Sequence, residues 1–178
     1  MIHTEVKKVL HSSNEIAHRI SELGETINTK YGNEELVVVM LLKGALIFTS
    51  DIIRELKMPL QIECIKVSSY KGGMESTNEV EFLDHALPEV SGRNVLIVDD
   101  ILDTGQTLYA VAERLKRAGA KQLERCVLLS KKKERLADVE AEYVGFEIGD
   151  EFVVGYGLDF RGLYRNLPYV GIYQPEQA

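Results

Sequence analysis

Acidic residues gather at the end of an apolar run in the middle of the chain. Asp99 and Asp100 directly follow residues 94–98, and Asp103 lies three positions further on. An ionised carboxylate only accepts hydrogen bonds, whereas the diol of a ribose presents two donors. We therefore expect at least one of the paired acids to face sugar hydroxyls. If the strand continues through the pair, the two side chains point to opposite sides and make different contacts.

The residues after this pair predict a phosphate site. They are Asp103, Thr104, Gly105, Gln106 and Thr107, and a helical pattern follows them. The first amides of a helix lack intrahelical partners, and the helix dipole favours negative charge at that end. We expect these amides and the two threonine hydroxyls to bind a phosphate, with Gly105 allowing close backbone approach. The alternative is a structural turn in which Thr104 is only a helix N-cap.

The surrounding pattern predicts alternating strands and helices. A capping box at Ser12 and Glu15 begins an amphipathic helix that ends near Gly32. This alternation implies an α/β fold with a doubly wound, mostly parallel sheet, in which ligands bind beyond the carboxyl ends of the strands. The expected strands are 36–42, 61–67, 94–98, 123–129, 143–148, 152–156 and 169–173, and further helices are expected at 45–56 and between 107 and 119.

Length and composition favour a single domain over residues 1–178, with 45% hydrophobic content for a core. The net charge of -7 argues against a nucleic-acid surface, but a small anionic substrate fits if local cations or amide dipoles reverse the potential in one cleft. We expect a cytoplasmic protein without membrane contact, because no leader-like or membrane-spanning run is visible. Cys64 and Cys126 are expected to be buried free thiols.

The segment 99–107 resembles the phosphoribosyl pyrophosphate binding motif of type I phosphoribosyltransferases. Within that family, Asp103 resembles the acid of the 6-oxopurine branch, the hypoxanthine-guanine phosphoribosyltransferases. Residues 42–44, 152–153 and Asp159 agree, so the resemblance covers nearly the whole chain. It implies the type I phosphoribosyltransferase fold, with a small hood formed by the terminal segments. It also implies purine salvage: hypoxanthine, guanine or both would react with phosphoribosyl pyrophosphate to give IMP or GMP, with Mg²⁺ as cofactor.

The resemblance assigns roles to the central motif. Residues 103–107 would hold the 5'-phosphate of the sugar. Asp99 and Asp100 would bind the ribose hydroxyls directly or through Mg²⁺, although the family often has the longer Glu where Asp99 stands. Asp103 would be the catalytic residue, accepting or sharing a proton near N7 of the purine.

Pyrophosphate is expected at two further places. In relatives the bond that matches Leu42–Lys43 is a cis peptide whose neighbouring amides hold pyrophosphate, which implies this role for Lys43 and Gly44. The alternative is a solvated lysine at a strand end. The resemblance also implies Arg165 as a pyrophosphate ligand, with Arg161 as the competing candidate.

The purine pocket is expected in the last third of the chain. Lys131 follows a strand, and its ammonium is suited to donate to O6 of the base, which would select oxopurines over aminopurines. The adjacent Lys132 and Lys133 favour the alternative of a solvated basic run.

Three residues near the C-terminal end complete the expected site by resemblance. Phe152 would stack on the purine, and Val153 would offer backbone groups to its edge. Phe152 could instead belong to the core, as an alternating strand would predict. Asp159 would lie at the purine side and join Asp99 and Asp100 in binding the metal, or it is a surface charge.

A lid is expected over this site. Residues 68–79 have no hydrophobic period and contain two glycines, and Ser69 and Tyr70 match the Ser-Tyr pair that begins the family's lid. Closure would exclude water from a cation-like sugar. An ordinary flexible loop is the alternative.

Two rival functions stay open. A non-catalytic regulator could keep the ligand motif, but it normally needs a basic surface or an additional domain. A phosphoribosyltransferase for adenine or orotate is the nearer alternative, against which Asp103 and Lys131 argue. The preference among hypoxanthine, guanine and xanthine depends on contacts to the purine 2-position. The resemblance implies a homodimer or homotetramer.

Overall fold

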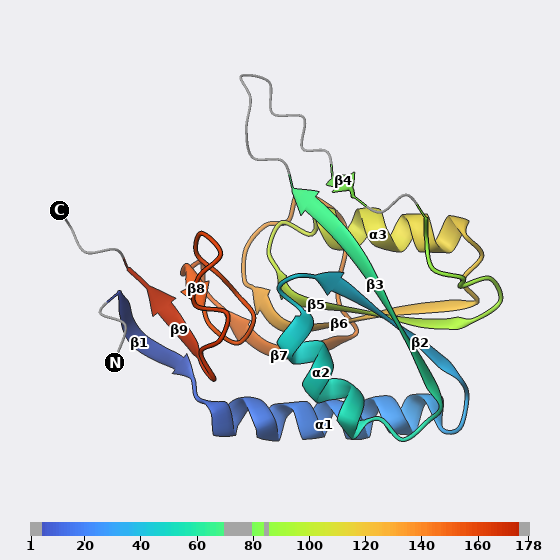
Figure 1. The fold of residues 1–178 in the computed structure, drawn as a ribbon, viewed down its shortest axis with the longest axis horizontal. Helices are drawn as coiled ribbons and strands as arrows, with labels where there is room; N and C mark the ends of the chain where they lie inside the picture. The colour runs from blue at the N-terminus through green and yellow to red at the C-terminus, as the bar shows by residue number, and fades with distance from the viewer. Residues whose placement is uncertain (1–4, 70–79, 84–85, 175–178) are drawn as a thin grey trace.

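The computed structural model of the chain describes residues 5–69, 80–83 and 86–174 (Figure 1). Its main sheet has six strands in the order β4-β3-β2-β5-β6-β7. Neighbouring strands pair in parallel from β3 to β7, whereas β4 is antiparallel to β3. The strands are β2 Leu36–Leu42, β3 Leu60–Ser69, β4 Val80–Phe82, β5 Asn94–Leu102, β6 Gln122–Lys131 and β7 Tyr143–Ile148.

Helices cover both faces of this sheet. The helices α1 Ser13–Tyr31 and α2 Leu46–Glu55 lie on one face, and α3 Gln106–Arg117 lies on the other (Figure 1). The apolar run of β2 suits this position, since Leu36 and Val38 pack with α1 and α2 while the residues between and after them pack with α3. The predicted doubly wound, mostly parallel sheet is therefore confirmed.

The predicted capping box of α1 is also confirmed. The Glu15 amide donates to Ser12 Oγ at 3.3 Å, and the Ser12 amide donates to Glu15 Oε2 at 2.8 Å. The helix ends where Gly32 adopts a φ of 58° and donates its amide to Asn28 O at 2.9 Å.

A second sheet forms the hood. It has the order β1-β9-β8, with β1 Val6–His11, β8 Val153–Val154 and β9 Val170–Tyr173, so segments from both ends of the chain meet (Figure 1). The sequence did not predict β1, because lysines interrupt its alternation. The predicted strand 152–156 shrinks to two residues because Gly155 and Gly157 turn the chain with φ of 96° and 101°.

Three further differences concern the main sheet. The strand β5 continues through the acids to Leu102, four residues beyond the prediction. Residues 132–142 form a loop between β6 and β7 where a crossover helix would be usual. Cys126 is buried as predicted, but the prediction for Cys64 was wrong: it is exposed, because α2 packs against β2 and β5 rather than β3.

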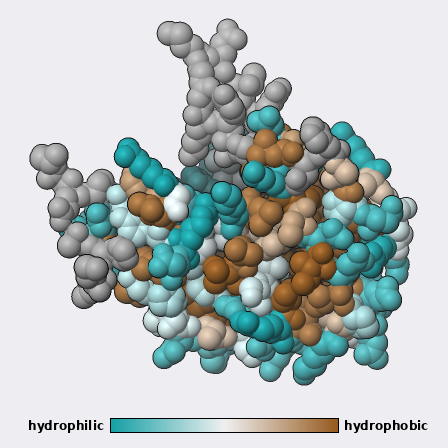
Figure 2. All heavy atoms as spheres, in the orientation of Figure 1, coloured by the Kyte–Doolittle hydropathy of each residue, from teal (hydrophilic) through white to brown (hydrophobic). Residues whose placement is uncertain are grey.

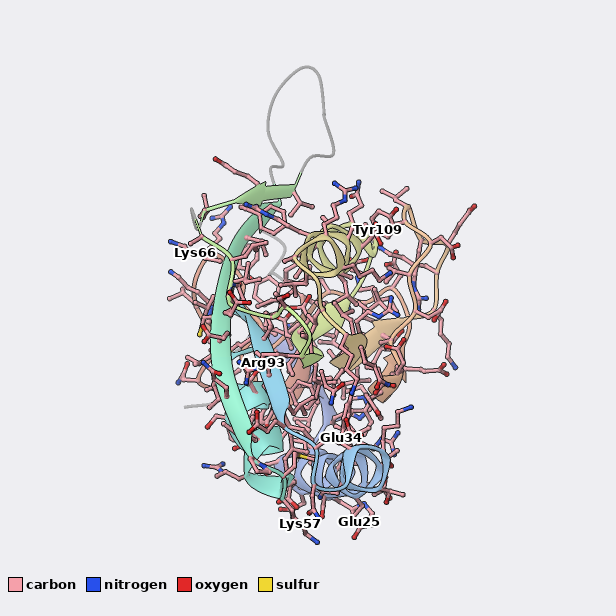
Figure 3. The ribbon with its side chains drawn as sticks, turned by 90° about the vertical axis from the view of Figure 1, so that its right-hand side faces the viewer. Glu25, Glu34, Lys57, Lys66, Arg93 and Tyr109 are labelled. Atoms are coloured by element: carbon pink, nitrogen blue, oxygen red, sulfur yellow. The ribbon has the colours of Figure 1, made fainter. Side chains whose placement is uncertain are left out.

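The surface differs between the faces and ends of the sheet. Figure 2 shows apolar side chains gathered over α2 and β3, where Leu46 and Ile62 are 50% and 46% exposed. Figure 3 shows the amino ends of the strands, with Glu34 and Arg93 between α1 and α3. Within the described ranges, no helix combines the length and apolar character needed to cross a bilayer.

Candidate active site

A cavity of about 400 Å³ lies where β2, β3 and β5 end and α3 begins. Its lining includes Gly44, the paired acids Asp99 and Asp100, and the turn 103–107. Parallel strands end at one edge of a sheet, so residues far apart in the sequence meet there. The structure thus brings together the residues that the sequence analysis assigned to phosphate, ribose and one part of the pyrophosphate.

The turn 103–107 leaves the start of α3 without a side-chain cap. Gly105 is the N-cap, with a φ of 82°, and no side-chain hydrogen bond caps the helix. A Cβ at Gly105 would lie 2.6 Å from Val139 Cγ1, so the turn also packs closely against the loop after β6. The alternative in which Thr104 is the N-cap is therefore wrong. The first amides of α3 can hold an anion.

The loop after β6 supports this turn from behind. The Leu136 amide donates to Thr104 O at 3.0 Å, and the Ala137 amide lies 3.3 Å from the same oxygen. These contacts fix the carbonyl of Thr104 and leave the other side of the turn facing the cavity.

Asp99 and Asp100 are partly buried at the end of β5. The Asp100 amide donates to Asp99 Oδ1 at 3.0 Å, and Asp100 Oδ2 lies so close to Gly44 that a Cβ there would be 1.7 Å away. Any larger residue at position 44 would displace this carboxylate. No lysine or arginine among the described residues forms an ion pair with either acid.

Burial dominates the electrostatics of this pair. It raises the pKa of Asp99 well above the usual range, and the neighbouring Asp100 charge raises it further. Burial also raises the pKa of Asp100, although hydrogen bonds and the positive charge of Arg165 act in the opposite direction. Two adjacent carboxylates in this environment favour a bound cation or hydroxyl donors.

Asp103 lies in a cluster of charges. Lys131 Nζ is 3.8 Å from Asp103 Oδ2 and 3.3 Å from Asp150 Oδ1, and the Lys131 side chain is only 10% exposed. Lys133 Nζ contacts Asp103 Oδ1 and lies 3.4 Å from Asp150 Oδ1. Lys132 instead pairs with Glu147 at 2.8 Å. Of the three lysines, Lys131 and Lys133 therefore face the candidate site, and Lys132 faces away.

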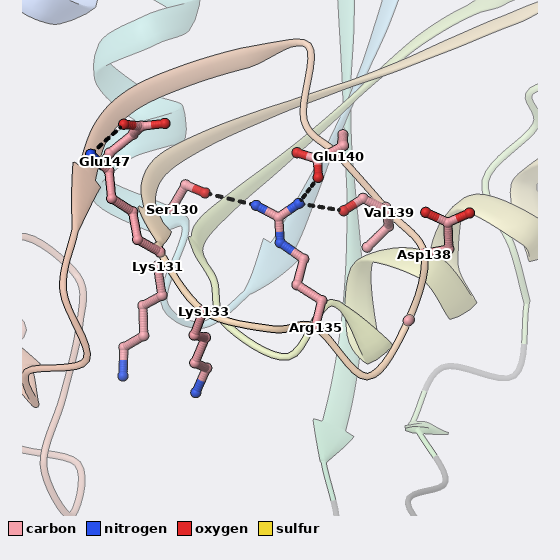
Figure 4. Close-up of a pocket in the computed structure, with 10 residues that line it drawn as sticks. Ser130, Lys131, Lys133, Arg135, Asp138, Val139, Glu140 and Glu147 are labelled. Carbon is pink, nitrogen blue, oxygen red and sulfur yellow. Dashed lines mark hydrogen bonds and ion pairs between the residues drawn. The ribbon is translucent and has the colours of Figure 1, made fainter.

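Lys133 and Asp150 were not predicted from the sequence as neighbours of Asp103. Alternation along the end of β6 was the available signal, since side chains two positions apart share a side of an extended chain. Figure 4 shows Lys131 and Lys133 extending to one side, while Glu147 lies on the other.

A second cavity, of about 550 Å³, lies behind the loop that follows β6 (Figure 4). Arg135 shapes it by donating to Val139 O at 2.9 Å and to Ser130 Oγ at 3.1 Å, and it pairs with Glu140. The arginine thus holds the loop whose amides fix Thr104. A lone arginine in a polar loop carries no sequence period, so the sequence analysis missed it.

The hood carries the aromatic residue assigned to the purine. Phe152 is 52% exposed, which contradicts the alternative of a core residue. Its ring makes edge contacts with Phe160 and Tyr173, at centroid distances of 5.8 and 5.9 Å. Val153 is buried in β8 and pairs with Ile172 of β9.

The remaining predicted residues lie around the turn after β2 and the loop after β8. Leu42–Lys43 is a cis peptide, as the resemblance implied, and Lys43 is exposed. Arg165 Nη2 lies 2.6 Å from Asp159 Oδ1, and the Gly162 amide donates to Asp159 Oδ2 at 2.6 Å. The competing Arg161 is exposed, with its guanidinium 5.1 Å from the Phe160 ring centre.

Two further predictions concern the lid and the metal site. Ser69 is the last residue of β3, and Tyr70 lies outside the described residues. Among the residues that are described, no three His, Cys, Asp or Glu side chains form a metal-binding group, so Asp159 does not join Asp99 and Asp100 in one cluster.

The comparison with protein families agrees with this geometry. A family model described as "Phosphoribosyl transferase domain" matches residues 7–161. The chain belongs to the phosphoribosyltransferase family. It is 45% identical to the hypoxanthine-guanine phosphoribosyltransferase of Staphylococcus aureus (strain Mu50), over 98% of each chain.

Solved structures support the same membership and confirm the fold class. A hypoxanthine phosphoribosyltransferase crystal structure from Staphylococcus aureus has a TM-score of 0.92 and 45% identity, covering 98% of this chain and 95% of that one. A hypoxanthine-guanine phosphoribosyltransferase from Bacillus anthracis has a TM-score of 0.90 and 39% identity, with 96% and 100% coverage. The type I phosphoribosyltransferase fold predicted from the sequence is therefore correct.

Proposed function

We propose that this phosphoribosyltransferase is a purine salvage enzyme that acts on hypoxanthine, guanine or both. A bond forms between a purine nitrogen and the anomeric carbon of phosphoribosyl pyrophosphate, and the bond from that carbon to the pyrophosphate oxygen breaks. The products are IMP or GMP, pyrophosphate and the proton of the purine nitrogen. The observation that carries this proposal is the contact between Asp103 and Lys131 beside the uncapped turn 103–107.

The sugar donor is proposed to bind along the edge of the main sheet. The amides of 103–107 and the hydroxyls of Thr104 and Thr107 hold the 5'-phosphate. Asp99 and Asp100 accept hydrogen bonds from the ribose hydroxyls. Lys43, Gly44 and Arg165 hold the pyrophosphate. Their positions at the ends of β2 and β5 and in the loop between β8 and β9 support one extended binding surface.

Magnesium fits the donor set at the paired acids. Two neighbouring carboxylates whose pKa burial raises, with no protein cation paired to them among the described residues, favour a hard divalent cation. Asp99 and Asp100 would hold Mg²⁺, whereas Asp159, which resemblance adds to this set, pairs with Arg165 and lies outside their cluster. When bound, Mg²⁺ supplies charge neutralisation of the leaving pyrophosphate.

Asp103 and Lys131 are proposed to act on the base. Lys131 donates to O6 of a 6-oxopurine, an acceptor that adenine lacks. Asp103 accepts or shares the proton that leaves the purine as the new bond forms. Phe152 stacks on the purine, and the backbone of Val153 meets its edge. By resemblance, Ser69 and Tyr70 begin a lid that excludes water from the reacting sugar.

The remaining proposals concern the whole molecule. Residues 1–178 act as one domain in the cytoplasm, without nucleic-acid or membrane partners. A homodimer or homotetramer is proposed, and the half-exposed Leu46 and Ile62 on α2 and β3 offer an apolar face for self-association (Figure 2).

Initial rates with single bases test the function. Hypoxanthine, guanine, xanthine, adenine and orotate are compared at matched phosphoribosyl pyrophosphate and Mg²⁺, with chelation of the metal as a control. We expect one or more 6-oxopurines to react at least about a hundredfold faster than adenine or orotate. Equal or faster reaction with adenine or orotate would contradict the base assignment. Donor binding without turnover of any base would favour the non-catalytic regulator.

A further inference from the structure

A buried tyrosine joins the hood to α2. Tyr156 is 7% exposed and lies in the turn that follows β8. Its hydroxyl donates to Asp51 Oδ2 on α2, and Asp51 Oδ1 contacts Arg54 on the same helix. Burial and the neighbouring carboxylate raise the pKa of Tyr156, so the hydroxyl stays a protonated donor.

The residue after this tyrosine touches the turn proposed to bind pyrophosphate. A Cβ at Gly157 would lie 2.1 Å from Gly44 O, which means that the two backbones are in direct contact. The Gly157 carbonyl accepts a hydrogen bond from Arg165 Nη1 at 2.5 Å, and the Gly157 amide donates to Arg165 O at 3.0 Å. The hood, the Lys43–Gly44 turn and Arg165 therefore meet at Gly157, one residue from the anchored tyrosine.

The purine side of the hood has a separate anchor. The Tyr173 amide donates to Phe152 O at 2.8 Å, and Val153 pairs with Ile172 in the antiparallel ladder of β8 and β9. These contacts involve neither Tyr156 nor Asp51. Loss of the Tyr156 hydroxyl should therefore loosen the pyrophosphate side of the hood and leave Phe152 and Val153 in place.

We propose that Tyr156 and Asp51 are positioning residues for pyrophosphate. They touch no substrate, but their hydrogen bond holds Gly157 against Gly44 and so fixes the distance between the Lys43–Gly44 turn and Arg165. This inference rests on the proposed function, because it uses the pyrophosphate roles assigned above. A bond from a buried hydroxyl to a carboxylate suits this task, since charge-assisted hydrogen bonds are strong and directional.

The matched test compares Tyr156→Phe with Tyr31→Phe. Both variants remove a hydroxyl from a buried tyrosine that donates to a carboxylate, but Tyr31 donates to Glu124 at 2.9 Å at the amino end of the sheet. In Tyr156→Phe we expect the KM for phosphoribosyl pyrophosphate to rise about tenfold, the scale of one lost hydrogen bond. The KM for hypoxanthine at saturating donor and kcat should change by less than about twofold. Tyr31→Phe should leave both KM values unchanged while lowering Tm by a similar amount.

A readout that does not need turnover accompanies the kinetics. Calorimetry of inorganic pyrophosphate binding should show a Kd raised about tenfold in Tyr156→Phe and unchanged in Tyr31→Phe. Unchanged donor KM and pyrophosphate Kd in Tyr156→Phe would overturn the inference. An equal rise in the KM of both substrates, or the same rise in Tyr31→Phe, would overturn it as well, because either result indicates general loosening.

Asp51→Ala, which leaves no acceptor for the tyrosine hydroxyl, supplies a second variant if Tyr156→Phe folds poorly, since the Asp51 side chain is 32% exposed and tolerates change more easily. It should raise the donor KM similarly, and the double variant should be no worse than the stronger single variant, because both remove one shared bond. Additive effects would contradict that mechanism. A wild-type protein without turnover of any 6-oxopurine would contradict the proposed function instead, and the pyrophosphate calorimetry would still decide the role of Tyr156.

Discussion

Carboxylates at the two ends of the parallel sheet differ in how many hydrogen-bond and ion-pair partners they have. At the amino end, Glu124 accepts hydrogen bonds from Tyr143 at 2.6 Å and from Tyr31 at 2.9 Å, and Lys30 Nζ lies 3.5 Å away. At the carboxyl end, Asp99 accepts a hydrogen bond from the backbone amide of Asp100 and forms no ion pair with any described residue. Both acids lie on strands of one sheet, so their environments differ because of the groups that contact them.

The pKa shifts express this contrast. Burial acts to raise the pKa of Glu124, but the hydrogen bonds from Tyr143, Tyr31 and Gln122 and the charge of Lys30 together outweigh it and lower the pKa overall. Burial and the Asp100 charge together raise the pKa of Asp99. A fully partnered acid stabilises the fold, whereas an acid in an unfavourable environment retains capacity for a ligand.

Other polar groups at the amino end follow the pattern of Glu124. Glu34 accepts a hydrogen bond from Asn94 at 2.8 Å, and Lys121 Nζ lies 3.5 Å from the same carboxylate (Figure 3). Arg93 donates to Gln61 at 2.6 Å. We infer that substitutions at the amino end change stability, and that substitutions at the carboxyl end change catalysis.

The largest effect is expected at Asp103. Asp103→Asn should reduce kcat by about a hundredfold or more, the scale of a general acid or base, while phosphoribosyl pyrophosphate still binds. The side chain is 38% exposed, so the fold should persist. Steady-state kinetics with hypoxanthine and calorimetry with the sugar donor measure the two quantities. Unchanged turnover in a folded variant would remove Asp103 from the mechanism.

The second-largest kinetic effect is expected for Lys131→Met. The O6 acceptor of the base would lose its charged donor, which costs roughly 1.5–3 kcal/mol, or about ten- to more than a hundredfold in kcat/KM for 6-oxopurines. Lys132→Met is the matched control, because Lys132 pairs with Glu147 and faces away from Asp103.

Donor affinity separates a local effect from misfolding in this pair. It should be unchanged in both variants, because the phosphate-binding amides and hydroxyls of residues 104–107 are untouched. Equal losses in Lys131→Met and Lys132→Met would make the lysines a basic surface rather than a purine site. No loss in Lys131→Met would move the O6 donor to Lys133, which also contacts Asp103.

The smallest kinetic effect is expected at Glu124. Glu124→Gln should leave kcat and both KM values within about twofold and lower the free energy of unfolding by about 1 kcal/mol. Because the folded-state pKa of Glu124 is lowered, its stabilising contribution is complete above the ordinary value of ~4.3 and is lost as pH falls through the folded pKa.

Chemical denaturation between about pH 3 and pH 7 measures this contribution. The difference in unfolding free energy between wild type and Glu124→Gln should shrink as the pH is lowered. A difference in unfolding free energy that stays constant with pH would contradict the proposed contrast between the two ends of the sheet. A kinetic defect in Glu124→Gln as large as that of Lys131→Met would contradict it as well.

The sequence predicted the main sheet well because its buried strands are strongly patterned. The run 36–42 is apolar on both faces, and β2 occupies those residues without a shift. Hydrophobic patterning did not predict β1, because the strand is half exposed and contains Lys7 and Lys8. It is held in place by pairing with β9, which comes from the other end of the chain. Pairing between chain ends leaves no local pattern.

The candidate site was predictable where a local motif marks it. The turn 103–107 and the paired acids follow one another in the chain, so their meeting needs no knowledge of the fold. Lys133, Arg135 and the contact of Gly157 with Gly44 depend on how a loop and the hood pack against distant strands. Spacing in the sequence does not encode those contacts.

Base competition in a single reaction tests the central claim most directly. Wild-type protein is mixed with equal amounts of hypoxanthine, guanine, adenine and orotate, one supply of phosphoribosyl pyrophosphate, and Mg²⁺, and the nucleotides are identified by mass spectrometry. The account predicts that IMP, GMP or both account for essentially all of the product. Formation of AMP or orotidine monophosphate as the main product would contradict it, and so would the absence of any nucleotide.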